Sequence, residues 1–189
     1  MDSTLFISFS VGLFVVLVVI LVMMYNTLIG RKNDVENASS SIDAMLRRRY
    51  DLIPNLVDAV KHFMEHETGL MTQLTELRTT SYELMTQTER VQLDKNIRST
   101  LGNVMVVAEN YPELKSSGNM IHLQETLNEV EGQIAAARRS FNAAITEYNN
   151  GIEMFPLNVV AAAMGLRQQE WFEIENHQRE VASVKGLFK

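Results

Sequence analysis

Residues 123–155, LQETLNEVEGQIAAARRSFNAAITEYNNGIEMF, decide the fold class. Apolar residues recur there at alternating steps of four and three for nearly five heptads, which is the period of a helix that buries one stripe. The stripe comprises Leu123, Leu127, Val130, Ile134, Ala137, Phe141, Ala144, Tyr148, Ile152 and Phe155. Pro156 ends the pattern, because proline cannot continue a helix. A stripe of this length predicts an antiparallel bundle or a coiled coil.

Three shorter helical patterns precede this stretch. The first buries Val35, Ala38, Ile42, Met45, Arg49 and Ile53. Pro54 then predicts a boundary or kink, and a second stripe comprises Leu56, Val57, Val60, Phe63, Leu70, Leu74 and Leu77. The spacing of Thr86 and Glu89 predicts a capping box, opening a helix that buries Ile97, Leu101, Val104 and Ala108. No segment alternates as a strand does, so the sequence predicts an all-α fold.

The N-terminal end carries no charge between Asp2 and Arg31. The 21 residues from Leu5 to Tyr25 form a helix of roughly 31 Å, the thickness of the hydrocarbon core of a bilayer. A cleaved signal peptide would start with positive charge and end at small residues, and neither is present. A core helix of a soluble domain would rarely be apolar on all sides. We therefore expect a single transmembrane helix that continues into the bundle.

The flanking charges predict an orientation. Arg31 and Lys32 follow the span, three arginines come soon after at 47–49, and no lysine or arginine precedes it. The positive-inside rule places the bundle in the cytoplasm and the N-terminus outside. We expect an anchor at residues 1–30, a helical bundle domain at 31–156, and a short helical or irregular tail at 157–189. Ser8 and Gly12 form a small-xxx-small pair that would let two spans pack closely.

Composition excludes several classes of function. The net charge of −6 and the absence of a basic face argue against nucleic-acid binding. The absence of cysteine excludes disulfides, thiolate metal sites and thiol nucleophiles. No glycine-rich loop with a lysine is present, so no phosphate-bearing cofactor is expected.

One short motif raises the question of an enzyme. His62, Glu65 and His66 have the H-x-x-E-H spacing of inverted zinc proteases, in which two histidines one helical turn apart hold zinc. The alternative is a solvated helix face. A five-residue match without the mixed α/β fold of those proteases favours the solvated face, so we expect a protein that is not an enzyme and has no metal or cofactor.

Polar residues beside the long stripe predict a structural or interaction network. Unpaired polar groups there would be costly, so they should bond to a neighbouring helix, where Arg47, Arg48, Arg49 and Asp51 offer partners. Such ladders fix register and partner choice more often than they perform chemistry. The candidate network comprises Arg48, Arg49, Tyr50, Asp51, Asn55, Glu131, Arg138, Asn142, Tyr148 and Asn149.

Several short segments stand out in order along the chain: YNTL at 25–28, RRYDLIPNLV at 48–57, ENYPELK at 109–115, IAAARR at 134–139, FN at 141–142, EYN at 147–149 and FPLN at 155–158. Together they resemble the LemA family of bacterial membrane proteins. Two positions depart from the family pattern: Phe141 stands where tyrosine is frequent, and Ser39 where tryptophan is usual. The resemblance implies a membrane helix, a long-helix bundle and no catalytic residues. Family members often occur beside a membrane-bound metalloprotease, and one divergent branch is associated with membrane organelles.

Two hypotheses about function follow. The first is a self-associating scaffold or structural protein of the bacterial cell envelope, a homo-oligomer anchored in the inner (cytoplasmic) membrane by a single span. The second is an adaptor or regulator of another membrane protein, such as a protease or a sensor, docked through outward-facing Arg49, Tyr50, Asp51 and Asn55. A zinc hydrolase using the histidine pair is a remote alternative.

Overall fold

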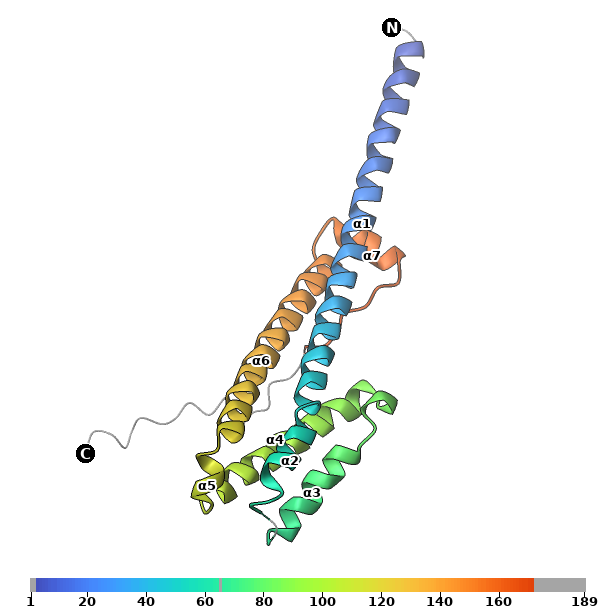
Figure 1. Ribbon diagram of the computed structural model, residues 1–189. Helices are drawn as coiled ribbons and strands as arrows, with labels where there is room; N and C mark the ends of the chain where they lie inside the picture. The colour runs from blue at the N-terminus through green and yellow to red at the C-terminus, as the bar shows by residue number, and fades with distance from the viewer. Residues whose placement is uncertain (1–2, 65, 172–189) are drawn as a thin grey trace, which may run out of the picture. The chain divides into compact units, whose positions relative to one another are not determined.

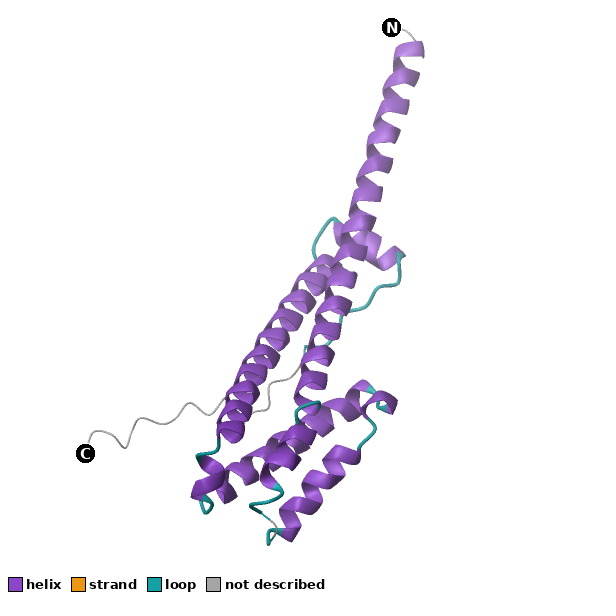
Figure 2. Cartoon of the chain, in the orientation of Figure 1, coloured by secondary structure: helices purple, strands orange, loops and turns teal. Residues whose placement is uncertain are grey.

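The computed structural model describes residues 3–64 and 66–171, and every regular element among them is helical (Figures 1 and 2). The predicted all-α class is confirmed. The chain divides into two compact units, one formed by residues 1–35 and 141–189 and the other by residues 36–140. Two long helices run through both units. The predicted division into anchor, bundle and tail at residues 30 and 156 stays a prediction.

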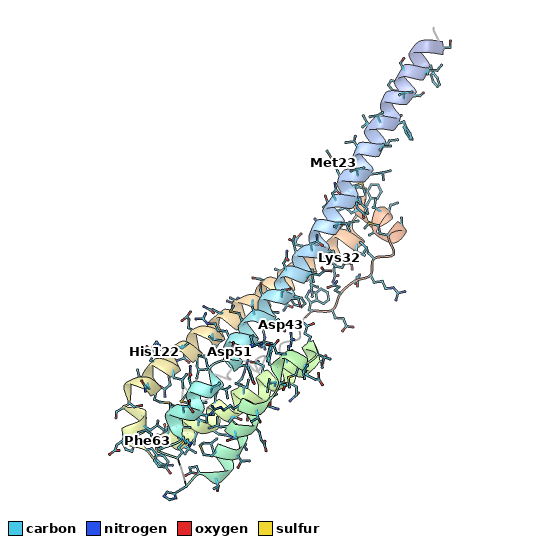
Figure 3. All side chains as sticks on the ribbon, turned by 45° about the vertical axis from the view of Figure 1, so that its right-hand side comes forward. Met23, Lys32, Asp43, Asp51, Phe63 and His122 are labelled. Atoms are coloured by element: carbon cyan, nitrogen blue, oxygen red, sulfur yellow. The ribbon has the colours of Figure 1, made fainter. Side chains whose placement is uncertain are left out.

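Helix α1 (Ser3–Tyr50) is a single unbroken helix. The apolar side chains of its N-terminal part are exposed. The most apolar 18-residue window has a mean hydropathy of 3.0, and none of its residues is buried. Figure 3 shows the side chains around Met23 directed away from the helix on its different sides. This segment is a candidate membrane span.

The rest of α1 is amphipathic. Its buried positions recur at heptad-like spacing: Leu28, Val35, Ile42, Leu46 and Arg49. Three of them belong to the predicted stripe, whereas Ala38 and Met45 are half-buried and Leu46 takes a buried position that the prediction omitted. The three arginines of the last turn lie where positive charge complements the partial negative charge of a helix C-terminus.

The boundary predicted at Pro54 is confirmed. Helix α2 (Ile53–Val60) carries Pro54 in its first turn, where the missing N–H costs nothing. Helix α3 (Thr68–Thr79) buries Leu70, Leu74 and Leu77 and packs against α2. The second predicted stripe is therefore divided between two helices separated by a turn that contains Phe63.

Helix α4 (Gln87–Ala108) follows the short 3-10 turn η1 (Tyr82–Leu84) and packs against α3. The predicted capping box is confirmed: Glu89 N–H donates to Thr86 Oγ1 at 3.4 Å, and Thr86 N–H donates to Glu89 Oε2 at 2.7 Å. Ile97, Val104 and Ala108 are buried as expected, and Leu101 is half-buried. The short helix α5 (Pro112–Lys115) packs against α4.

Helix α6 (Gly118–Glu153) corresponds to the long stripe. Ser117 caps it, since its Oγ accepts from Met120 N–H at 3.3 Å. Leu123, Leu127, Val130, Ile134 and Tyr148 are buried. Phe155 is not: α6 ends two residues earlier, so the prediction that Phe155 closes the stripe is wrong.

The unit that contains both termini shows the pairing of the two long helices. Arg31 Nη1 of α1 donates to the Glu147 carbonyl of α6 at 2.7 Å. Val35 packs with Ile145 and Tyr148 in one cluster, while Leu28 and Arg31 lie against Gly151. Contacts move back along α6 as α1 advances, so the helices are antiparallel in this unit.

Helix α7 (Leu157–Ala163) follows α6 after a tight corner. It ends in a Schellman motif: Gly165 has φ +67°, its N–H donates to the Ala162 carbonyl, and Leu166 N–H donates to the Ala161 carbonyl, both at 3.1 Å. The chain then returns along α6. Asn149 bonds the main chain of Gln169 twice, as donor at 2.9 Å and as acceptor at 3.0 Å, and the Trp171 indole donates to Thr146 Oγ1 at 3.1 Å.

Candidate functional site

Arg49, in the last turn of α1, is the most deeply buried charged residue of the described chain, with 2% of its surface exposed. Its guanidinium pairs with the carboxylates of Asp94 on α4 and Glu131 on α6. The expectation that Arg49 faces outward to a partner is therefore wrong. The residue occupies a position of the apolar stripe, where only ion pairing makes a charge tolerable.

Two further arginines complete an ion-pair cluster of five residues. Asp94, only 3% exposed, also accepts from Arg138 Nη2 at 3.3 Å and lies 3.5 Å from Arg98 Nη2. Arg98 reaches Glu131 at 3.3 Å. The cluster joins α1, α4 and α6 within the unit of residues 36–140.

The electrostatics of the cluster favour fixed pairing over proton transfer. Burial lowers the pKa of Arg49, and the charge of Asp94 acts in the opposite direction. Arginine nevertheless stays protonated in proteins, so Arg49 is not an acid–base catalyst. Each carboxylate meets at least two guanidinium groups. Such a saturated arrangement sets helix register.

A cavity of about 370 Å³ lies beside this cluster. Arg49 and Glu131 form part of its wall, and the rest comes from α4 and α6: Leu101, Gly102, Met105, Gln124, Leu127 and Asn128. Its wall is mixed apolar and amide in character.

A second polar group surrounds Tyr82. The guanidinium groups of Arg47 and Arg90 lie 5.3 and 4.9 Å from the centre of its ring, and the Tyr50 ring lies 5.3 Å away. Burial is the main cause that raises the pKa of Tyr82 to about 12. Cations over an aromatic face are attracted by its electron density, so this group holds the end of α1 against η1.

The predicted network is divided among several places. Arg49, Glu131 and Arg138 meet in the cluster, while Arg48 bonds Gln133 at 2.7 Å. The other predicted residues of this unit take separate positions: Tyr50 Oη donates to the Thr80 carbonyl, Asp51 pairs with Arg47 at 2.9 Å, and Asn55 is exposed.

The remaining predicted residues belong to the unit with the termini. Asn142 is half-buried, Tyr148 lies in the apolar cluster, and Asn149 bonds the returning chain at Gln169. Burial raises the pKa of Tyr148, which keeps its phenol neutral.

Sequence reasoning missed Asp94, which pairs with all three arginines of the cluster. A signal was present: Asp94 lies three residues before Ile97 and seven before Leu101, so it shares their helix face. An acidic residue on an apolar face predicts a buried cation opposite it.

The histidine motif lacks the helical geometry that the prediction assumed. His62 and His66 lie in turns between α2 and α3, and Glu65 lies outside the described residues. Within 3–64 and 66–171, no three histidine, aspartate or glutamate side chains gather as a metal site would require. His122 lies on α6 at the wall of a cavity, and His177 lies outside the described residues.

Comparison with known proteins gives the family. The LemA family model matches residues 38–185. Magnetosome protein MamQ 1 of Paramagnetospirillum magneticum is 28% identical over 179 residues, which cover 81% of this chain and 66% of that protein. Magnetosome protein MamQ of Magnetospirillum gryphiswaldense is 26% identical, with 89% of this chain and 71% of the relative covered. Protein LemA of Metamycoplasma hominis is 27% identical, with 82% and 71% covered.

These matches extend over most of this chain but only about two thirds of the length of the Paramagnetospirillum relatives. The matched region begins within α1 and includes α2 to α7. With its exposed apolar helix and all-helical body, this membrane-associated chain belongs to the LemA family.

Proposed function

We propose that the protein is a non-enzymatic, membrane-anchored scaffold that self-associates in the bacterial cell envelope. The observation that carries this proposal is the unbroken helix α1, which joins an exposed apolar span to a helical bundle. Copies anchored in this way share one membrane and one orientation. Their effective concentration is then high, so weak lateral contacts suffice for assembly.

The contacts between copies would not use the long stripe of α6. Leu127, Val130 and Ile134 are already buried within one chain. The span offers a better surface: Gly12 has open space where a side chain would project, and lies one turn from Ser8. Small residues at this spacing allow close approach of two helices in lipid.

The mass of the full-length protein in nanodiscs and in mild detergent tests self-association. We expect a defined oligomer whose mass is constant across protein concentrations. A matched variant, Gly12→Leu, should weaken the oligomer if the span contributes, and Gly30→Leu, also in open space on α1, serves as its control. A monomer at every concentration would contradict the scaffold.

An adaptor for another membrane protein is the second candidate. A cavity of about 460 Å³ favours it, because Asn55, one of the expected docking residues, forms part of the wall. Leu52, Asp58, Asn119 and His122 line the same cavity and supply both hydrogen-bonding and apolar contacts. Cross-linking in native membranes separates the two candidates: a dominant hetero-product favours the adaptor, and a dominant homo-product favours the scaffold.

A further inference from the structure

The corner between α6 and α7 continues into an uncharged stretch at residues 154–166, MFPLNVVAAAMGL, which we call the corner segment. No charge occurs in these thirteen residues between Glu153 and Arg167. Met154, Phe155 and Val159 are 62%, 81% and 63% exposed. Contiguous exposed apolar groups of this kind mark a contact surface for a protein or a membrane.

The position of the corner segment follows from the pairing of the long helices. Gly151 lies against Leu28 and Arg31, which follow the end of the apolar span at Tyr25 by three and six residues. Because the helices are antiparallel here, α6 continues from Gly151 towards the span. Met154 is three residues further along, and its N–H still bonds the Asn150 carbonyl of α6 at 2.9 Å, so the corner segment begins about 4.5 Å nearer the span than Gly151. Figure 1 shows α7 beside α1, and Figure 3 shows it at the level of the stretch of α1 between the labelled Met23 and Lys32.

We propose that the corner segment inserts into the lipid interface and forms a second membrane contact beside the span. The exposed apolar side chains contact lipid at the boundary between headgroups and acyl chains, and they enter the bilayer to a depth of about 5–10 Å. Continuity with the span argues for lipid: the helix that enters the bilayer emerges beside these side chains.

Some residues of the segment face the protein, so the contact is one-sided. Ala161 is fully buried, whereas Val159, two residues earlier, is exposed. The Schellman motif at Gly165 then turns the chain back along α6. One side of helix α7 therefore packs against its own unit and the other side is exposed, as in a helix that lies in a membrane interface.

Single-cysteine labelling tests the proposal, because the chain contains no cysteine. Met154→Cys and Val159→Cys would carry an environment-sensitive fluorophore in the full-length protein in phosphatidylcholine–phosphatidylglycerol vesicles. We expect blue-shifted emission that is quenched by lipids bearing a nitroxide near the headgroup. The matched control, Leu84→Cys in the 36–140 unit, is 87% exposed and should show neither effect.

Three results would count against the proposal. Emission from the corner label that matches Leu84→Cys would mean that the segment stays in water. A blue shift without lipid quenching, lost when the protein is diluted in lipid, would make a second copy of the chain the occupant. A Phe155→Asp change should abolish quenching at Val159→Cys with the helical circular dichroism intact, and quenching retained there would count against an apolar contact.

Discussion

At the scale of single residues, Arg49 shows how a charge can occupy a stripe position. Its stem replaces an apolar side chain of α1, and its guanidinium meets Asp94 and Glu131. A buried pair of this kind adds little net stability over an apolar core, but removing one partner leaves the other charge unpaired. The cluster therefore selects one register of α1 against α4 and α6, because other registers would bury charges without partners.

Substitution of Asp94 should lower the stability more than substitution of any other residue of the cluster, because Asp94 pairs with three arginines. We expect Asp94→Asn to lower the free energy of unfolding by about 3–5 kcal/mol, the usual cost of breaking a buried ion pair. Chemical denaturation followed by helical circular dichroism measures the loss. The control is Glu129→Gln, which affects an exposed pair with Arg48 at 3.5 Å and an exposed hydrogen bond from Gln133 at 2.7 Å, and should leave the midpoint almost unchanged. Equal midpoints for the two variants would contradict a supporting role for Asp94.

Tyr82 predicts a pH dependence at the alkaline end. Its pKa of about 12 in the folded protein lies above the value of about 10 for an unfolded chain, so folding favours the protonated phenol. Its contribution to stability is complete below pH 10 and is lost as the pH rises towards 12. We expect Tyr82→Phe to remove this part of the slope in denaturation curves measured from pH 9 to 12. A slope identical to that of the parent protein would refute the assignment.

At the scale of elements, the sequence predicted the ends of helices better than their interruptions. Pro54 and the Thr86 capping box act through a missing donor and a local bond, so a few residues suffice to identify them. The break between α2 and α3 was missed because Phe63 and Leu70 are seven residues apart, a spacing that also fits one continuous helix. Asp94 was missed because two of its three arginine partners, Arg49 and Arg138, lie 45 and 44 residues away in the sequence.

Gly132 and Gly151, two glycines in the interior of α6, give opposite expectations. Gly132 has open space around it, so Gly132→Ala should stabilise the protein by about 0.5–1 kcal/mol through higher helix propensity. At Gly151 an added Cβ would lie 2.8 Å from Arg31 Nη1 and 3.3 Å from Leu28 Cδ2. Gly151→Ala should displace Arg31 from the Glu147 carbonyl and give no gain or a loss. Thermal melting of both variants tests this, and equal stabilisation would contradict the close contact.

At the scale of the whole molecule, the two units differ in what they expose. The unit with the termini carries the span and the uncharged corner segment, while the 36–140 unit carries the ion-pair cluster and the polar group around Tyr82. The all-α fold and the family were predictable because helical periodicity and hydropathy are local properties. The division into these units was not predictable, because it depends on contacts between distant parts of two helices.

Orientation in the membrane is testable with the same cysteine-free background. If the bundle is cytoplasmic, as the arginines and lysine after the span predict, Leu84→Cys should react with a membrane-impermeant maleimide only after spheroplasts are permeabilised. Ser3→Cys, at the N-terminal end of α1, should react in intact spheroplasts and serves as the opposite control. Labelling of Leu84→Cys in intact spheroplasts would reverse the topology.

The amide pair between Asn149 and Gln169 has a consequence for how the sequence can change over evolution. The Asn149 amide hydrogen-bonds the main-chain N–H and carbonyl of Gln169, and every amino acid except proline supplies both groups. Natural selection can therefore replace the side chain at 169 freely, whereas the amide at 149 has no equivalent substitute. Among related sequences we expect various side chains at position 169 but no proline there. We expect asparagine to persist at position 149.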